Sequence, residues 1–302
     1  MSPIIDIHHV RFSVADLAKQ RQFLEDFGMK VNEEDGVLYA RGTDASPYIY
    51  IAEQGEPAFL GLAFAASSLQ DLTEIAAIDG AVIENSSLPG GGKIVHLTDP
   101  DGLSVDVVFG ITESDTLPVP SRLPLNTGST QGRQNERVIL QDASVVIKRL
   151  GHCVINVTDF RTSEAWYKER FGLLTSDEIQ LDDNGTVLGA FMRCNRGEKF
   201  VDHHTLFLVH AGKLEFNHAA FEIADWDMLM RGHDLLTNRG YEARWGIGKH
   251  VLGSQVFDYW KDPAGFTLEH FTDGDLFNES WGSHKAPLEQ LLKVQWGPDG
   301  AP

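Results

Sequence analysis

The sequence predicts an α+β protein built from four βαβββ modules in two similar halves. Three observations predict this fold: the second half repeats the first, alternating apolar segments precede helical ones, and the helical segments stop at glycines. The stretch HHVRFSVADLAKQRQFLEDFG from His8 returns as GHCVINVTDFRTSEAWYKERFG from Gly151. Further on, FLGLAFAA returns as FNHAAFEI, and DPDGLSVD returns as DPAGFTLE. The chain therefore carries an internal duplication.

Each half opens with an alternating strand, IHHVRFSV or LGHCVINV, followed by Asp16 or Asp159 at the position of a helix N-cap. A helix follows in both halves, and Gly28 and Gly172 are typical helix stops. The β-branched and aromatic segments GVLYAR, YIYIAE, VLGAFMRC and HHTLFLVH then predict strands. The strand–helix order recurs at LGLAFAA with SLQDLTEIAAIDG, and at HAAFEIA with WDMLMRGHDLLTNRG. These repeats define the four modules.

The length and the repeat together predict two domains. A chain of 302 residues exceeds the usual single-domain size. We expect an N-terminal domain without metal at 1–115, a Pro- and Gly-rich linker at 116–140, and a catalytic C-terminal domain at 141–275. The tail at 276–302 has no counterpart in the first half, and our hypothesis for it is a lid.

Composition excludes several classes of function. Apolar residues make up 42% of the chain and charged residues 23%, which is typical of a soluble globular protein. We see no signal peptide or membrane span and expect a cytoplasmic protein; the two cysteines, Cys153 and Cys194, fit a reducing compartment. A formal net charge of −19 repels phosphate backbones and anionic membranes. Neither nucleic acid nor a membrane is an expected partner.

Only the second half carries a complete set of metal donors. Aligning the halves gives three pairs of positions: His152 over His9, His218 over Gly61, and Glu269 over Asp106. Two imidazoles and one carboxylate occupy one face of an octahedral ion and leave positions open for small molecules, as at Fe(II). Nine of the twelve histidines follow residue 150. The pattern therefore predicts a catalytic metal site in the second half.

A histidine on an apolar strand is more often a hydrogen-bonded core residue than a ligand. We keep that interpretation for four histidines: His210, His233, His270 and His284. The matching repeat positions favour the ligand interpretation for His152, His218 and Glu269, because a buried glutamate without a partner is costly.

At this point the residues resemble a known family. The stretch HVLGSQVFDYWKDPAGFTLE, from His250 to Glu269, resembles the signature of type I extradiol ring-cleavage dioxygenases of the vicinal oxygen chelate superfamily. The shared features are a His, an aromatic residue with Tyr, Asp-Pro-x-Gly and a final Glu, with a DHH run ahead of His218. That family has the glyoxalase/bleomycin resistance/dioxygenase-like fold, with four βαβββ modules in two domains, so the resemblance covers nearly the whole chain.

The resemblance implies extradiol, or meta, cleavage of a catecholic aromatic compound, with both atoms of dioxygen inserted at a non-haem Fe(II) centre or, less often, at Mn(II). It also implies a homo-oligomer and the metal ligands His152, His218 and Glu269. Dioxygen is the co-substrate, and no NADH or flavin is needed.

The same resemblance implies three catalytic residues. Tyr259 and His250 would hydrogen-bond the substrate, and His204 would stabilise negative charge on the dioxygen side and donate a proton. Which of His203 and His204 faces the metal stays open, because neighbouring strand residues point to opposite sides; we prefer His204.

The substrate pocket is expected to include five further residues: Val154, Phe191, His203, Arg244 and Trp281. Arg244 and Lys249 are our better candidates for holding a carboxylate substituent, although surface positions are commoner for such residues. Two alternatives remain for the function: a glyoxalase-like isomerase on the same fold, and a metal-free protein that binds a small molecule.

Overall fold

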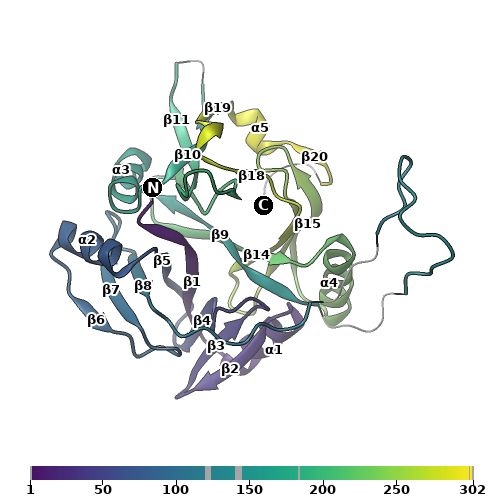
Figure 1. Cartoon of the computed structure of the whole chain (residues 1–302), viewed down its shortest axis with the longest axis horizontal. Helices are drawn as coiled ribbons and strands as arrows, with labels where there is room; N and C mark the ends of the chain where they lie inside the picture. Colours follow the sequence, from purple (N-terminus) through teal and green to yellow (C-terminus); the bar gives the residue numbers. More distant parts are fainter. Residues whose placement is uncertain (1, 120–123, 140–144, 183, 299, 301–302) are drawn as a thin grey trace.

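The computed structural model describes residues 2–119, 124–139, 145–182, 184–298 and 300. The first half contains two modules, each made of a strand, a helix and three strands (Figure 1). The elements of the first module are β1 (Ile4–Val14), α1 (Leu17–Asp26), β2 (Lys30–Glu34), β3 (Val37–Arg41) and β4 (Tyr50–Gln54). Those of the second are β5 (Ala58–Ala66), α2 (Leu69–Asp79), β6 (Ile83–Asn85), β7 (Lys93–Thr98) and β8 (Ser104–Phe109).

The second half repeats this order with one short additional strand. Its first module contains β9 (Ile147–Val157), α3 (Phe160–Phe171), β10 (Leu174–Gln180), β11 (Val187–Arg193), β12 (Val201–Asp202) and β13 (Leu206–His210). Its second module contains β14 (Glu215–Ile223), α4 (Trp226–Arg239), β15 (Ala243–His250), β16 (Val256–Lys261) and β17 (Thr267–Thr272). The elements of the tail are β18 (Leu276–Phe277), η1 (Glu279–Trp281), β19 (His284–Pro287), α5 (Leu288–Leu292) and β20 (Val294–Trp296).

Each half forms one mixed sheet with the same strand order. The first sheet runs β2-β3-β4-β1-β5-β8-β7-β6, and the second runs β19-β10-β11-β13-β9-β14-β17-β16-β15-β20. The inner strands of the second sheet correspond one to one with those of the first, and the tail strands β19 and β20 lie at its two edges. The predicted α+β fold of four βαβββ modules is confirmed.

Both predicted N-caps and one of the two predicted glycine stops are found; α1 is capped instead by Phe27, one residue before Gly28. The side chains of Asp16 and Asp159 accept hydrogen bonds from the backbone N–H groups of Lys19 and Thr162, which satisfies donors in the first turns of α1 and α3. Gly172 ends α3 in the left-handed conformation with φ of 60°, which glycine adopts without strain.

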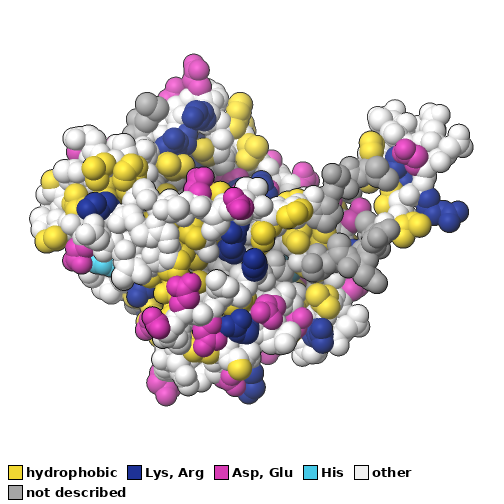
Figure 2. Space-filling view, turned by 60° about the horizontal axis from the view of Figure 1, so that its bottom comes forward, with side chains coloured by type: hydrophobic (Ala, Val, Ile, Leu, Met, Phe, Trp, Pro, Cys, Tyr) yellow, Lys and Arg dark blue, Asp and Glu magenta, His cyan; other side chains and the backbone are white. Residues whose placement is uncertain are grey.

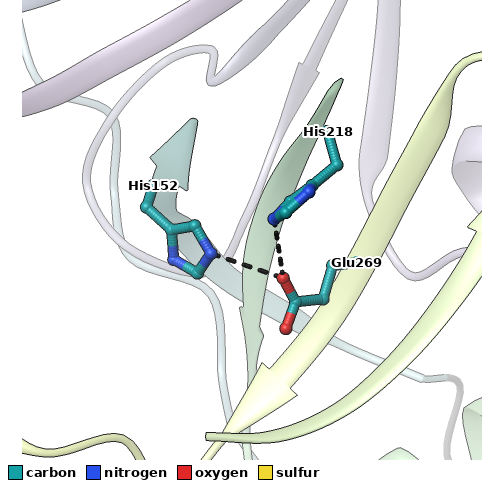
Figure 3. A group of neighbouring side chains, drawn as sticks. All are labelled: His152, His218 and Glu269. Carbon is teal, nitrogen blue, oxygen red and sulfur yellow. Dashed lines mark ion pairs between the residues drawn. The ribbon is translucent and has the colours of Figure 1, made fainter. Parts of the chain in front are cut away.

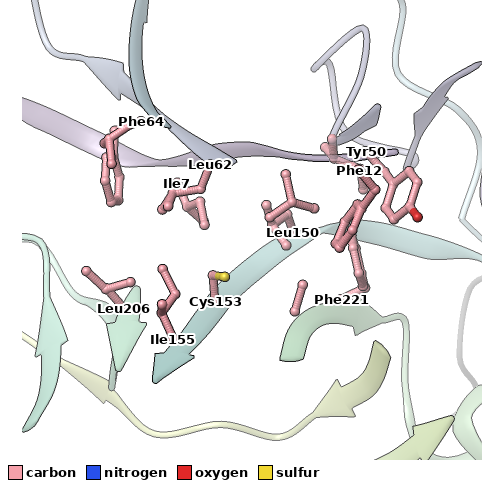
Figure 4. Packing of buried hydrophobic residues seen from close by; sticks show 14 of the residues in the cluster. Ile7, Phe12, Tyr50, Leu62, Phe64, Leu150, Cys153, Ile155, Leu206 and Phe221 are labelled. Atoms are coloured by element: carbon pink, nitrogen blue, oxygen red, sulfur yellow. The ribbon is translucent and has the colours of Figure 1, made fainter. Parts of the chain in front are cut away.

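The two sheets pack against each other through one continuous apolar core, rather than each half enclosing a separate one. In Figure 4, Ile7 and Leu62 of the first half lie opposite Cys153 and Ile155 of the second. Val154, between them on β9, belongs to a different cluster. Because strand side chains alternate in direction, one face of β9 faces the shared core and the other is free to build a site.

The tail closes both edges of the second sheet. Strand β19 pairs with β10 in parallel, and β20 pairs with β15 in antiparallel orientation, so α5 spans from one edge to the other. Arg193, which is 1% exposed, holds the start of this segment by donating to the carbonyls of Asn278 and Gly282.

Of the expected linker, residues 116–119 and 124–139 are described, and the second of these segments extends away from the body of the molecule and is almost entirely exposed (Figures 1 and 2). Residues 120–123 and 140 of that linker lie outside the described residues. Figure 2 shows acidic and basic side chains interspersed over one face of the protein, without a continuous basic surface there. Among the described helices, none is both long and apolar enough to span a membrane.

Candidate metal centre

Three neighbouring strands of the second sheet bring the predicted ligands together. His152 on β9 pairs with Ala220 on β14, and Ala220 pairs in turn with Glu269 on β17. His218 stands two residues before Ala220 and therefore points to the same face. Figure 3 shows the two imidazoles and the carboxylate directed toward a common point.

The geometry of this triad is compact and buried. One donor atom from each of His152, His218 and Glu269 lies within 4.8 Å of the other two. The Nε2 atoms of both histidines stand 3.3 Å from the same Glu269 oxygen, Oε2. Exposure is 3%, 7% and 1% for the three residues, so bulk water does not compete for them.

The electrostatics of the triad fit a divalent cation. Burial lowers the pKa of His152, which keeps its imidazole neutral and able to donate a lone pair. Burial alone would raise the pKa of Glu269, but the contacts with His152 and His218 hold it below its ordinary value. Neither oxygen of this buried carboxylate has a hydrogen-bond partner of good geometry. Uncompensated oxygens are costly, and a cation at the convergence point would satisfy them.

A second group of side chains lies against the triad. The ring of His204 lies 3.9 Å from that of His152, and Tyr259 packs edge-on against His218 at 5.2 Å between ring centroids. The Tyr259 hydroxyl and Nε2 of His250 are 3.0 Å apart. Burial lowers the pKa of His250 to about 4 and raises that of Tyr259 well above its ordinary value. Both groups are therefore neutral hydrogen-bonding partners at pH 7.

The pair His203 and His204 does not lie on a strand, contrary to our expectation. The strand predicted from HHTLFLVH begins only at Leu206, and the two histidines occupy the connection after β12. The Ser176 hydroxyl donates to the His203 carbonyl at 2.6 Å, and the His203 amide donates to the carbonyl of Asp275. Residues distant in sequence thus hold this connection from both sides, and these hydrogen bonds take the place of those that a β-strand would form there.

His203 lies behind His204 rather than in the cavity. Its Nδ1 is 2.9 Å from Nδ1 of His204, and its Nε2 is 2.7 Å from Oδ2 of Asp177 on β10. His203 is 0% exposed. The chain from Asp177 through His203 to His204 was not foreseen, although an adjacent pair of buried histidines signals that a partner is required.

A cavity of about 160 Å³ opens beside the triad. Of the predicted site residues, it is lined by His152, His204, His218, His250, Tyr259, Val154 and Phe191. Sequence reasoning missed Asn217, Gln255 and the tail residues Gln290, Leu291 and Leu292, which also line it.

Two expected pocket residues, besides His203, lie elsewhere. Trp281, the last residue of η1 in the tail, is 45% exposed and stacks on Phe277 with ring centroids 4.1 Å apart. Arg244 is exposed near the start of β15, far along the strand from His250 at its end. The expectation that these residues line the pocket is corrected accordingly.

The four histidines interpreted as hydrogen-bonded core residues all have local partners, but only His270 is buried: His233 is half-buried, and His210 and His284 are exposed. Nε2 of His270 donates to the Phe27 carbonyl at 2.8 Å. His233 contacts Asp258 at 3.2 Å, and His284 contacts the Trp281 carbonyl at 2.9 Å.

The equivalent position in the first half is filled by protein groups. Strand register places His96 opposite Asp106, as Tyr259 stands opposite Glu269. Asp106 is paired with Arg11 at 3.1 Å and with His96 at 2.7 Å. Arg11 occupies the position of Val154 in the second half, and its guanidinium already provides a positive charge next to Asp106.

Comparison with known proteins places the chain in a family. The profile of the Glyoxalase/Bleomycin resistance protein/Dioxygenase superfamily matches residues 149–270, which include the whole triad. Metapyrocatechase 2 of Cupriavidus necator is 30% identical over 297 residues, covering 97% of this chain and 89% of that protein. The chain belongs to this superfamily, among its extradiol ring-cleavage dioxygenases. An "Iron-dependent extradiol dioxygenase" of Rhodococcus jostii is 26% identical over half of each chain.

Solved structures share the fold of this dioxygenase along its whole length. A substrate complex of homoprotocatechuate 2,3-dioxygenase from Brevibacterium fuscum superposes with a TM-score of 0.81 at 19% identity, covering 100% of this chain and 91% of that one. The Mn(II)-bound glyoxalase from Novosphingobium aromaticivorans gives 0.78 at 21% identity, covering 100% and 94%. The chain is a metal-dependent enzyme of the same architecture.

Proposed function

We propose that the protein opens the ring of a catecholic compound by extradiol cleavage, with Fe(II) held by His152, His218 and Glu269. The observation that carries the proposal is the buried triad with two unsatisfied carboxylate oxygens beside a cavity lined by His204, His250 and Tyr259. Two imidazoles and one carboxylate suit Fe(II) and leave positions for a chelating substrate and dioxygen. When bound, the ion supplies a Lewis acid for the catechol oxygens and a path for electrons to dioxygen.

Tyr259 and His250 orient the substrate. The Tyr259 hydroxyl is a neutral donor at pH 7, because burial raises its pKa, and it lies 3.0 Å from the His250 imidazole. Tyr259 and His250 together can therefore donate one hydrogen bond to a catechol oxygen. The tyrosine hydroxyl stays protonated while they do so. This arrangement favours a substrate that binds with one ionised oxygen, which a hydroxyl donor stabilises.

His204 holds and returns a proton at Nε2. Asp177, as a carboxylate, can only accept, so His203 donates from Nε2 and presents a lone pair at Nδ1. That lone pair accepts the Nδ1–H of His204, which leaves Nε2 as the free nitrogen of the His204 ring. Burial lowers the pKa of His204 well below its ordinary value, so this nitrogen starts unprotonated. A nitrogen with a lowered pKa is a weak base, so a proton that it accepts from the substrate hydroxyl is readily given up again.

The test is oxygen uptake by protein loaded anaerobically with Fe(II), using a panel of substituted catechols. The expected result is consumption of one dioxygen per catechol with a coloured ring-opened product. His204→Asn should bind iron and catechol normally but turn over more slowly, by about 10²-fold or more. Uptake of no oxygen with any catechol, in protein that retains its iron, would contradict the proposal and favour the isomerase alternative.

The resemblance to the family also supports a homo-oligomer, which gel filtration with light scattering would test directly. A particle of 33.5 kDa would be the monomer and would contradict this part of the proposal.

A further inference from the structure

The cavity beside the triad has an apolar wall besides its histidines and amides. Apart from the histidines and Tyr259, it is lined by aliphatic and aromatic side chains and by three neutral amides. Phe191 and Phe207 stack with ring centroids 3.9 Å apart and form one flat side of the wall. Within the described part of the chain, no lysine, arginine, aspartate or glutamate lines this cavity.

The cations that could have held an anionic substituent are engaged elsewhere. The Lys249 ammonium donates to Asp273 at 2.7 Å. Arg193 is buried and donates to backbone carbonyls of the tail and of β10. Arg196 donates to the Ser67 hydroxyl of the first half at 2.6 Å. None of these three lines the cavity, and neither does Arg244.

The tail completes the apolar wall. Leu291 on α5 packs against the cluster that contains Val154, Phe191 and Phe207. Leu292, the next residue, lines the same cavity and is 44% exposed. Because β19 and β20 fix α5 at both ends to the edges of the sheet, these leucines have a defined place over the cavity.

We propose that this cavity selects catechols carrying an uncharged, apolar substituent, alkyl or aryl, over carboxylated catechols, and that Leu291 and Leu292 of α5 determine this selectivity. The inference rests on the proposed function and adds the class of substrate. A carboxylate placed against this wall would lose its hydration without gaining a cation. An alkyl or aryl group would instead remove its own surface and that of Leu292 from water, which is favourable.

The experiment measures equilibrium binding by anaerobic calorimetry, together with oxygen uptake. Three ligands differ at one substituent: 3,4-dihydroxyphenylacetate, its methyl ester and 4-propylcatechol, with the 3-substituted series measured in parallel. We expect the ester and the alkylcatechol to bind at least about tenfold more tightly than the acid. Within an alkyl series, affinity should rise by up to about fourfold for each methylene that becomes buried.

Variants separate the wall from the rest of the site. Leu292→Arg is suited to the test because its side chain is already half-exposed, so the substitution should fold. It should raise affinity for the acid by about tenfold or more and lower affinity for 4-propylcatechol, so that the ratio of the two affinities reverses. Leu276→Arg places the same charge on the tail at a residue that is 56% exposed and outside the cavity lining, and selectivity should be unchanged.

The outcomes are distinguishable. If the protein opens catechol rings but binds the acid as tightly as its ester, the selectivity is refuted and the proposed function stands. If Leu292→Arg and Leu276→Arg shift selectivity equally, the assignment to α5 is refuted. If no ligand of the panel is bound or opened by iron-loaded protein, the proposed function fails and this inference with it.

Discussion

At the scale of single residues, the candidate site is built around one buried carboxylate. Glu269 faces two imidazoles, yet neither of its oxygens forms a hydrogen bond of good geometry. A ligand that binds only the folded state stabilises that state by mass action. The triad therefore predicts that the stability of the protein depends on a divalent metal.

We expect Fe(II), added anaerobically at 100 times its dissociation constant, to raise the free energy of unfolding by about 2.7 kcal/mol. Thermal unfolding with and without chelator measures this difference. His218→Ala should abolish the shift, because it removes one of the converging donors. His210→Ala, an exposed histidine of the same half, should retain it. An equal shift in both variants would place the ion elsewhere.

The Asp177–His203–His204 chain leads to a second prediction. In Asp177→Asn the side-chain amide can donate a hydrogen bond to His203. Asp177 then no longer fixes the tautomers of His203 and His204 that leave Nε2 of His204 free. We expect kcat to fall about tenfold to a hundredfold, as is usual when a residue that orients a functional side chain is replaced. The KM for the catechol and the iron content should be unchanged.

Nitrogen-15 NMR of the imidazoles should show the altered tautomer of His204 even in metal-free protein. Glu178→Gln is the matched control, since Glu178 is the next residue on β10 and pairs with Arg161 at 2.8 Å. A tautomer that is the same in wild type and Asp177→Asn would remove Asp177 from this role.

The triad was predictable because aligning the two halves shows which residue occupies the same position in each. His218 is conspicuous only when Gly61 stands at the same position of the other half. Asp177 and Leu291 were not predictable in this way. Asp177 acts through its contact with His203 and Leu291 through apolar packing, and strand order rather than a local pattern brings these distant segments together.

At the scale of elements, both halves bend the strand that leads into the metal position. The register of β1 with β5 shifts between Phe59 and Gly61, and that of β9 with β14 shifts between Phe216 and His218. One extra residue, Leu60 or Asn217, is therefore accommodated in each strand, as in a β-bulge. The duplicated halves kept the bulge and differ in the residue that follows it.

The backbone conformation of Gly61, rather than the bulge, explains why the first half cannot regain the second histidine by substitution alone, since His218 follows the same bulge without a positive φ. Gly61 has φ of 145°, and a Cβ there would stand 2.2 Å from the carbonyl oxygen of Ser104. We expect Gly61→His to lower the free energy of unfolding by about 2–5 kcal/mol, from backbone strain and overpacking together. Urea unfolding measures it.

Gly80→Ala is the control, because its φ is also positive but a Cβ would meet nothing within 4 Å. Its cost should stay near about 1 kcal/mol. If Gly61→His is as mild as Gly80→Ala and the protein then binds a second metal ion, the strain argument is wrong.

Most strands and helices were predictable from alternation and glycine stops, as the order of the modules shows. The exceptions are instructive. The tail forms β19 and β20 because the edges of the second sheet offer unpaired backbone groups, which no pattern within the tail reveals. The sequence of His203 and His204 is typical of the start of a strand, yet the backbone of His203 is hydrogen-bonded to the Ser176 hydroxyl and to the Asp275 carbonyl.

At the scale of the whole molecule, each Asp-Pro turn is also a contact between the halves. Oδ1 of Asp262 accepts from the amides of Ala264 and Phe266, as a turn residue should, while Oδ2 accepts from Gln20 of α1 at 2.9 Å. Its counterpart Asp99 accepts from the hydroxyl of Tyr167 of α3 at 3.2 Å. Each half thus contributes one Asp-Pro turn that contacts the first helix of the other half.

This contact predicts a pH dependence of stability. Burial raises the pKa of Asp262 from 3.8 to about 6. A raised pKa means that the folded state binds the proton more tightly, so the stabilising contribution is present below pH 4 and is lost as pH rises through 6. Ionisation should cost the folded state up to roughly 3 kcal/mol between those limits.

Asp262→Asn removes the titration while keeping an oxygen for the turn amides. The Gln20 amide can rotate to present Oε1, which has no partner in the described structure, to the new amide group. We expect the unfolding free energy of the variant, minus that of wild type, to rise as pH is raised from 4 to 7. Chemical denaturation across this range measures the difference, and a flat or falling difference would show that the charge of Asp262 does not oppose the packing of the halves.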